Sequence, residues 1–285
     1  MAGNILDIMA EQYPSFTKLG KRLTDYCRAH AAQVAYLPIS TLSKESGVSE
    51  ATITRFCRQL GLRGYNEFKL ELAKAGSVTD LGEEVGSVTS FSSEDSLEVL
   101  FRKLYNLQEI ALTETLSALD AEAVSRAADL LHHASHVYCM GSGGSMVTAK
   151  EAWARFITVT NQFVAITDSH MQIITAALAT EKDVLLFFSY SGATRNMEDL
   201  FTTARERHVP IVLITHVPSS PAAQLADVVL VCGCKESPLQ TGSIAAKISQ
   251  MFVIECLFYA YCQKNPARTN EARHLTAKAV AKKLL

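Results

Sequence analysis

The 285-residue sequence contains no stretch of about 18 apolar residues, so we expect no membrane-spanning helix. It also lacks the features of a signal peptide, because acidic residues and only a short apolar run occupy its first positions. Internal repeats and low-complexity tracts are absent as well. Together these absences predict a cytoplasmic globular protein rather than a membrane, secreted or repeat protein.

The seven cysteines show no disulfide framework, since they are odd in number and lie far apart. Most fall within apolar runs, as buried thiols do in the reducing cytosol. Cys232 and Cys234 form a C-x-C pair, but no second pair lies at the spacing of a zinc site. We therefore expect neither a metal site nor a cofactor.

The charge of the chain is distributed unevenly along its length. Residues 1–78 carry ten basic and seven acidic side chains, a net charge of +3, whereas residues 79–285 carry seventeen and twenty-two, a net charge of −5. A basic first part on an acidic body is typical of a DNA-binding domain joined to another domain. The apolar content of 48% is enough for a substantial core in each.

Composition also divides the chain. Helix-forming residues dominate up to about Ala75, and a tract rich in Gly, Ser, Thr and acids follows. We predict a DNA-binding domain at 1–76, a linker at 77–95, and a second domain at 96–285 that begins with helices. The first of these helices has apolar residues at three- and four-residue steps, and Asp120 can cap the next.

Beyond residue 136, short apolar runs alternate with longer helical patterns. The expected strands are His136–Met140, Phe163–Thr167, Val184–Phe188, Ile211–Thr215 and Val228–Val231. The expected helices are Ser145–Val159, Met171–Ala179, Thr194–His208 and Ser243–Tyr261. Continuous apolar strands separated by helices predict a parallel sheet covered on both faces. The fold class is therefore α + α/β, an all-helical domain followed by a three-layer α/β/α domain with a parallel five-stranded sheet.

The stretch from Pro38 to Lys69 has the pattern of two short helices joined by a tight turn. Ser40 can cap the first helix, Gly47 can adopt the positive φ of the turn, and Ser49 can cap the second helix. The second helix has an apolar inner face, carries Thr and Arg on its outer face, and is the right size for a major groove. This is the helix-turn-helix pattern, although a helix pair in an ordinary bundle has the same spacing.

The run SKESGVSEATITRFCRQLGLRGYNEFKLELA closely resembles the N-terminal domain of the RpiR family of bacterial regulators. It follows the family pattern V-S-x-x-T-x-x-R-F-C-x-x-L-G-x-x-G-[FY]-x-[ED]-[FL]-K over more than twenty consecutive residues, and departs only in Ser43, where such proteins often have Ala. The resemblance implies that the second helix faces DNA with Ser49, Glu50, Thr52 and Arg55, and secondarily with Thr54 and Arg58. Lys44, Arg63 and Lys69 are better placed for phosphates, although solvation explains the two lysines equally well.

Two glycine- and hydroxyl-rich loops each follow an expected strand and open a helix, GSGGS at 141–145 and SYSGAT at 189–194. Ligands of open α/β sheets bind at the carboxyl ends of strands, where helix N-terminal N–H groups form an anion site. One such loop would be weak evidence, but two predict a phosphate site. A dinucleotide loop is excluded because Met146 replaces the third glycine of G-x-G-x-x-G, and no Walker A sequence is present.

The loops and the strand order resemble the SIS (sugar isomerase) domain over about residues 130–260, and the RpiR family carries this domain after its helix-turn-helix. The S-x-S-G-x-T loop is a hallmark of its phosphate site. The resemblance implies that Ser189, Ser191 and Thr194 bind phosphate, helped by the backbone near Gly192. It also implies sugar contacts or pocket closure by Ser142, Gly143 and Ser145. His170 and Glu236 are further effector candidates, although His170 is equally compatible with a plain surface position.

An SIS domain is either an isomerase or a binding module. Isomerisation needs a base, and His170 and Glu236 are the candidates, but neither lies in a motif that demands catalysis. We therefore predict no catalytic residues and a transcription regulator, a repressor of carbohydrate metabolism genes, whose operator binding is modulated by a phosphorylated sugar. The alternative is a sugar-phosphate isomerase.

A homodimer or homotetramer is expected, because paired domains would hold two DNA-binding heads at the spacing of two half-sites. The apolar stripe of the first helix after the linker and the last helix of the sheet domain could supply contacts between subunits. Intramolecular packing is the default explanation for both. The stripe comprises Leu97, Leu100, Leu104, Leu107, Ala111 and Leu112.

Overall fold

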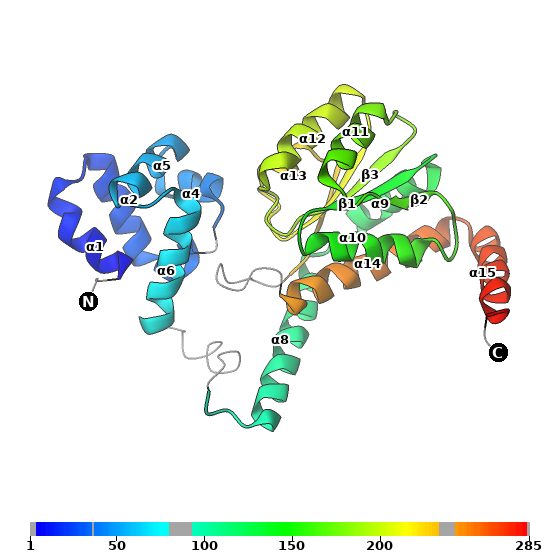
Figure 1. The fold of residues 1–285 in the computed structure, drawn as a ribbon, viewed down its shortest axis with the longest axis horizontal. Coiled ribbons are helices and arrows are strands. Elements are labelled where there is room, and N and C mark those ends of the chain that lie inside the picture. The colour runs from blue at the N-terminus through cyan, green and yellow to red at the C-terminus, as the bar shows by residue number, and fades with distance from the viewer. Residues whose placement is uncertain (1–3, 36, 80–92, 234–242, 284–285) are drawn as a thin grey trace. The chain divides into compact units, whose positions relative to one another are not determined.

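The computed structural model describes residues 4–35, 37–79, 93–233 and 243–283. These residues form two compact units (Figure 1), one reaching Glu109 and the other beginning at Ile110. The first unit is helical and the second contains a parallel sheet between helices. The predicted fold class is confirmed.

The first unit is a bundle of short helices around one apolar core. Its elements are α1 (Ile5–Gln12), η1 (Tyr13–Ser15), α2 (Lys18–Ala29), α3 (Ala31–Val34), α4 (Ile39–Ser46), α5 (Glu50–Gln59) and α6 (Tyr65–Thr79). Leu42, Ile53 and Phe68 are fully buried in that core. Phe56 packs edge-on against both Phe16 and Phe68, with ring centroids 5.0 and 6.2 Å away. The last helix extends three residues into the predicted linker.

The remaining elements belong mainly to the second unit. The helices are α8 (Leu97–Ala118), α9 (Ala121–His133), α10 (Ser145–Phe156), α11 (Ser169–Leu178), α12 (Arg195–Glu206), α13 (Pro221–Leu225), α14 (Ile244–Lys264) and α15 (Pro266–Ala281). The strands are β1 (Val137–Gly141), β2 (Phe163–Ala165), β3 (Val184–Phe188), β4 (Ile211–Thr215) and β5 (Val228–Val231). All five predicted strands are present, with β2 ending two residues early, whereas α13 and α15 were not predicted.

The five strands are all parallel, in the order β2-β1-β3-β4-β5. The chain passes from β1 outward to β2 and then returns to pair β3 with the other side of β1. The direction of winding therefore reverses between β1 and β3, and such a switch point opens a crevice at the carboxyl ends of the two strands. In the register of this pair Gly141 lies opposite Phe188, so the strands end side by side.

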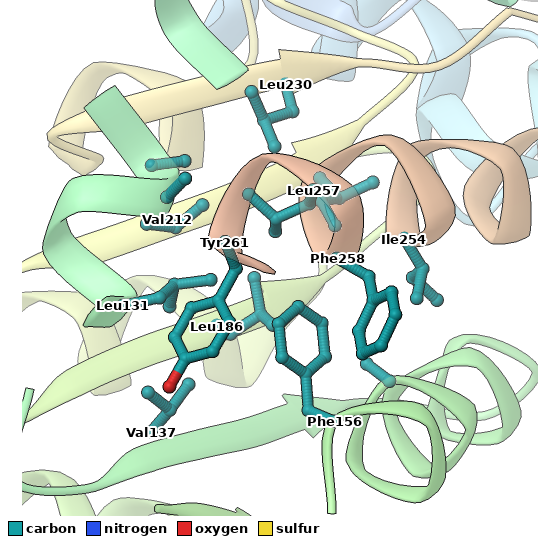
Figure 2. Packing of buried hydrophobic residues seen from close by; sticks show 14 of the residues in the cluster. Leu131, Val137, Phe156, Leu186, Val212, Leu230, Ile254, Leu257, Phe258 and Tyr261 are labelled. Carbon is teal, nitrogen blue, oxygen red and sulfur yellow. The ribbon is translucent and has the colours of Figure 1, made fainter. Parts of the chain in front are cut away.

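Side chains alternate along the strands between two cores. Val137, Leu186 and Val212 face a core shared with α9, α10 and α14, where Phe156, Phe258 and Tyr261 cluster (Figure 2). Leu185 and other residues of opposite parity face a second core with α11, α12 and α13. The two sets of helices lie on opposite sides of the sheet (Figure 1), which gives the three layers.

Helix α14 qualifies the expectation that no segment could span a membrane. It is long and apolar enough to do so by length and composition, and among the described residues no other helix is. About half of its apolar stretch is buried inside the second unit, and Thr148 of α10 donates a hydrogen bond to Gln250 of α14 at 2.7 Å. Burial in the core accounts for the apolar composition.

The apolar stripe of α8 is only partly buried, so intramolecular packing accounts for part of it. Leu97, Leu104 and Leu112 are 68%, 40% and 37% exposed, and only Ala111 of the predicted stripe is fully buried. Phe101 and Tyr105 on the same helix are also more than half exposed.

Replacing Phe156 by alanine tests the main core of the sheet unit. Phe156 stacks on Phe163 with centroids 4.0 Å apart and packs edge-on against Phe258 and Tyr261. Phe156→Ala should lower the free energy of unfolding of this unit by about 3–5 kcal/mol, because it leaves a cavity among rings that cannot collapse onto each other. The fluorescence of Trp153, the single tryptophan of the chain, reports urea unfolding of this unit from the same helix.

Leu178→Ala is the matched control, since Leu178 is 75% exposed at the end of α11. It should change stability by no more than about 0.5 kcal/mol. Equal effects of the two substitutions would contradict the assignment of Phe156 to the core.

Candidate functional site

The helix-turn-helix is formed by α4, a turn and α5. Gly47 adopts a φ of +66°, the left-handed conformation that the turn requires. Ser49 caps α5, its side chain accepting a hydrogen bond from the Thr52 N–H at 3.3 Å. The predictions for Gly47 and Ser49 are confirmed, whereas the prediction that Ser40 caps the first helix is wrong, because α4 begins at Ile39 with Pro38 at its N-cap.

The outer face of α5 carries the predicted DNA-facing side chains. Ile53 and Cys57 are fully buried, whereas Arg55 and Arg58 are exposed. The guanidinium of Arg55 lies 3.2 Å from the Thr52 hydroxyl, so these two side chains form one polar group near the start of the helix. Ser49 and Glu50 are exposed beside them, and Thr54 turns its hydroxyl back to the Glu50 carbonyl at 2.9 Å.

The three cations predicted for phosphate contacts differ in their surroundings. Lys44 is exposed in the last turn of α4, and Arg63 is exposed just before α6. The Arg63 backbone N–H donates to the Glu67 carboxylate at 2.5 Å, which fixes the chain there. Burial lowers the pKa of the Lys69 amine, so Lys69 is less suited to hold a solvent-facing charge than the other two.

Arg22 of α2 is a candidate that sequence reasoning missed. Its guanidinium lies against Gly47, where an added Cβ would come within 2.6 Å of Arg22 Nη2. Gly47 precedes Ser49 by two residues, so their Cα atoms are at most about 7.6 Å apart. The charge of Arg22 therefore lies near the start of α5. The sequence could not predict this position, because Arg22 belongs to a helix outside the helix-turn-helix motif.

The two predicted loops emerge at the switch point of the sheet. The first follows β1, with Ser142 and Gly143 exposed and Ser145 opening α10. Gly143 has a φ of +56° and open space around its Cα. The buried amide of Gln172 in α11 donates to the carbonyls of Gly141 and Ile166, each at 2.9 Å, and so holds the end of β1 in place.

The second loop follows β3 and turns tightly over Ser189, whose buried hydroxyl accepts a hydrogen bond from the Gly192 N–H at 3.2 Å. Gly192 has a φ of +60° and an added Cβ would lie 2.0 Å from Ser220 Oγ, so only glycine fits. Ser191 and Thr194 are exposed, and the Thr194 side chain makes no capping hydrogen bond to α12. Exposed hydroxyls at the start of a helix are suited to binding an anion.

The other effector candidates are less defined. His170 is the second residue of α11, exposed, with its N–H donated to the capping Asp168 at 2.9 Å. It lies beyond the carboxyl end of β2, at the same edge of the sheet as the two loops. Glu236 lies outside the described residues.

His216 and Tyr190 were also missed. They follow the ends of β4 and β3, and their rings stack with centroids 5.0 Å apart and an interplanar angle of 9°. The Nδ1 atom of His216 lies 3.0 Å from the Cys232 carbonyl oxygen. Tyr190 occupies a variable position of the S-x-S-G-x-T motif and His216 lies outside every motif, so only the pairing of β3 with β4 brings them together.

A cavity of about 480 Å³ lies at the opposite, amino edge of the sheet. Asp183, Pro210 and Asp227, which directly precede β3, β4 and β5, line it together with Arg126 and Lys182. Both aspartates have structural partners. Asp227 accepts the Ile211 N–H at 2.8 Å. Burial opposes ionisation of Asp183, but hydrogen bonds from Thr180 and His136 outweigh it and lower its pKa.

The described residues contain no group of three or more His, Cys, Asp or Glu side chains that could hold a metal ion. Two places bring the predicted site residues together, the outer face of α5 and the carboxyl edge between β1 and β3.

Comparison with known proteins decides the family. Residues 3–78 match the helix-turn-helix domain of the rpiR family, and residues 130–260 match the SIS domain. An HTH-type transcriptional regulator of Haemophilus influenzae is 32% identical over 257 residues, covering 90% of this chain and 89% of the relative. The chain belongs to the RpiR family. It is a helix-turn-helix transcriptional regulator with an SIS domain. A second HTH-type transcriptional regulator, from Caldanaerobacter subterraneus, is 30% identical over 92% of this chain and 91% of its own length.

Solved structures share the fold. The Vibrio vulnificus NanR protein, complexed with ManNAc-6P, aligns with a TM-score of 0.84 and 24% identity over 98% of each chain. The sugar isomerase domain of an RpiR transcription factor from Sphaerobacter thermophilus aligns with a TM-score of 0.56 and 22% identity, covering 62% of this chain and 97% of that domain.

Alanine substitutions at Gly143 and Gly192 distinguish the cost of a positive φ from the cost of a steric clash. Gly192→Ala places a Cβ against Ser220, whereas Gly143→Ala meets nothing within 4 Å although its φ is similar. Both should lose about 1 kcal/mol from the unfavourable φ, and Gly192→Ala should lose clearly more because the loop must shift. Urea unfolding followed by Trp153 fluorescence measures the difference, and a smaller loss for Gly192→Ala would contradict the loop geometry.

Proposed function

We propose that this RpiR-family regulator is a cytoplasmic repressor of carbohydrate metabolism genes, and that a phosphorylated sugar bound between β1 and β3 modulates its operator binding. The observation that carries the proposal is the pairing of two hydroxyl-rich loops at the switch point of the sheet, each opening a helix. Such an edge is where open α/β sheets bind ligands, and helix N-termini favour phosphate.

In this proposal the phosphate lies at the start of α12, bound by the hydroxyls of Ser191 and Thr194 and by backbone N–H groups near Gly192. Ser189 acts by holding the loop, since its hydroxyl is already engaged with Gly192. Ser142, Gly143 and Ser145 then contact the sugar from the first loop. His170 approaches from α11, and Glu236 is a further candidate. NanR, which shares this fold, is complexed with ManNAc-6P, and this supports the ligand class.

On the DNA side, base contacts come from the polar residues at the start of α5, namely Ser49, Glu50, Thr52 and Arg55, with Thr54 and Arg58 as secondary contacts. Lys44, Arg63 and Arg22 contact phosphates around them. Helix N-terminal side chains reach base edges, while surrounding cations fix the position of the protein without discriminating sequence. DNA-binding and effector-binding domains then correspond to residues 1–76 and 96–285, joined by the linker at 77–95.

The SIS domain acts as a sensor without catalysis, since the relatives that match along the whole chain are transcriptional regulators. The protein works as a homodimer or homotetramer. The exposed apolar side chains of α8 support this, because Phe101, Tyr105 and Leu116 are each more than 60% exposed and burying such residues against a second subunit is favourable.

The effector site is tested by the double substitution Ser191→Ala with Thr194→Ala. A panel of sugar phosphates is first screened by the thermal shift of the wild-type protein, since a bound ligand raises stability by mass action. With the compound that shifts most, the double variant should lose the shift and the change in operator affinity, while its binding to operator without the compound stays unchanged. Electrophoretic mobility shifts measure that affinity.

Thr203→Ala is the control on the same helix, because the Thr203 hydroxyl only bonds the Asp199 carbonyl within α12. It should respond as the wild type does. If the double variant responds normally, the effector binds elsewhere. Turnover of a sugar phosphate between aldose and ketose would show that the domain is an isomerase.

Arg55→Ala and Arg22→Ala separate base recognition from phosphate contact. Arg55→Ala should remove the preference for operator over random DNA. Arg22→Ala should weaken binding to operator and to random DNA alike. The plot of log affinity against log salt concentration should become shallower by about 0.9, as expected for one lost phosphate contact. Fluorescence anisotropy across a salt series measures both. Arg207→Ala, an exposed arginine of the second unit, should change neither. An unchanged operator preference would remove Arg55 from base contact.

A further inference from the structure

The loop after β3 is joined to β4 by a compact set of contacts. The Tyr190 carbonyl accepts hydrogen bonds from the His216 N–H at 3.0 Å and from the Thr215 hydroxyl at 3.1 Å. The Tyr190 and His216 rings also stack. A displacement of the SYSGAT loop therefore moves His216, because backbone and ring are both held to it.

His216 in turn is joined to the end of β5. Its Nδ1 atom lies 3.0 Å from the Cys232 carbonyl, and since a carbonyl only accepts, Nδ1 carries the proton of this hydrogen bond. The next residue, Gly233, donates its N–H to Thr115 Oγ1 of α8 at 2.9 Å. Five residues from four separate stretches of chain thus form one continuous path, namely Tyr190, His216, Cys232, Gly233 and Thr115.

The contact with α8 is unusually close. An added Cβ on Gly233 would lie 2.5 Å from the Thr115 nitrogen and 2.6 Å from the Glu114 Cβ, so the two backbones touch. Thr115 is fully buried and donates its own proton to the Ala111 carbonyl at 2.6 Å. The Thr115 hydroxyl therefore links the Gly233 N–H to the Ala111 carbonyl, one turn earlier in α8.

We propose that His216 and Thr115 are positioning residues that couple occupancy of the loop after β3 to helix α8. The inference rests on the proposed function, because it takes the loop to be the phosphate site. Phosphate bound by the loop shifts Tyr190 and His216, and the Cys232–Gly233 backbone passes the shift to Thr115. Helix α8 is continuous from Thr115 back to Leu97. The linker and the DNA-binding domain precede Leu97 in the sequence.

Packing and hydrogen bonding make this path suitable for transmission. The energy of a hydrogen bond falls steeply as donor and acceptor move apart. A buried donor left without a partner destabilises the fold by about 1–3 kcal/mol. Since no Cβ separates Gly233 from α8, the helix cannot stay in place when Gly233 moves toward it. A ligand shifts such an element only by binding its two positions unequally, and a physical path needs demonstrated coupling.

Hydrogen–deuterium exchange of the full-length protein, with and without inorganic phosphate as the probe, tests the coupling. In the wild type, phosphate should slow exchange in the loop at 189–194 and also in α8 around Thr115. Thr115→Val removes the acceptor of Gly233 while keeping the shape of the side chain. It should keep the slowed exchange in the loop and return α8 to its phosphate-free rate. Thr115→Ser, which keeps the hydroxyl, should restore the response of α8.

A second pair of variants tests the path at its midpoint, where the side chain is only partly buried. His216→Ala should abolish the response of α8. His216→Asn should retain it in large part, because the Asn amide can donate to the Cys232 carbonyl from nearly the position of Nδ1. A merely structural role would give neither the loss of the α8 response alone nor its rescue.

The outcomes separate the two proposals. If phosphate slows exchange in neither segment of the wild type, the phosphate site itself is wrong and the inference falls with it. If the loop responds but α8 does not, or if α8 still responds in both Thr115→Val and His216→Ala, the coupling is wrong while the proposed effector site stands.

Discussion

The parallel pairing of β1 with β3 is the interaction on which the positions of the loops at 141–145 and 189–194 depend. It aligns Gly141 with Phe188, so two loops that lie about fifty residues apart in the chain leave the sheet side by side. The helices after the two strands cover opposite faces, α10 on one and α12 on the other, so the chain leaves the sheet in opposite directions after the two loops. Without this pairing, each loop is an ordinary strand-to-helix turn.

Much of this could be predicted because the relevant signals are local. Three of the five strands have the predicted limits, since each is a short run of buried apolar residues with a polar or proline boundary. The helix-turn-helix was predicted because its turn needs a left-handed residue at Gly47 and a cap at Ser49, and both requirements are visible in the sequence. Strand β2 ended early because it lies at the edge of the sheet and pairs only with β1.

The features that sequence reasoning missed all depend on long-range packing. The guanidinium of Arg22 rests on Gly47 from a different helix, and His216 meets Tyr190 only through the pairing of β3 with β4. Gly233 carries no signal in the sequence, yet it is the residue that lets α8 approach the end of β5. In the same way, periodicity showed that α8 has an apolar stripe but could not show what the stripe contacts. Half of it, namely Leu97, Leu104 and Leu112, is exposed to solvent.

Helix α8 therefore meets two demands that constrain its sequence in opposite ways. Near Thr115 it must present small residues, because Ala111 and Thr115 admit the backbone of Gly233 and the hydroxyl of Ser249. On its exposed side it carries large side chains such as Phe101 and Leu116, whose burial would favour association with a second subunit. Because α8 is one continuous helix, a shift of its hydrogen-bonded side moves these exposed side chains with it. If subunits associate through α8, a displacement that begins at the effector loop would reach the subunit contact through this helix, and the spacing of two DNA-binding domains would change with it.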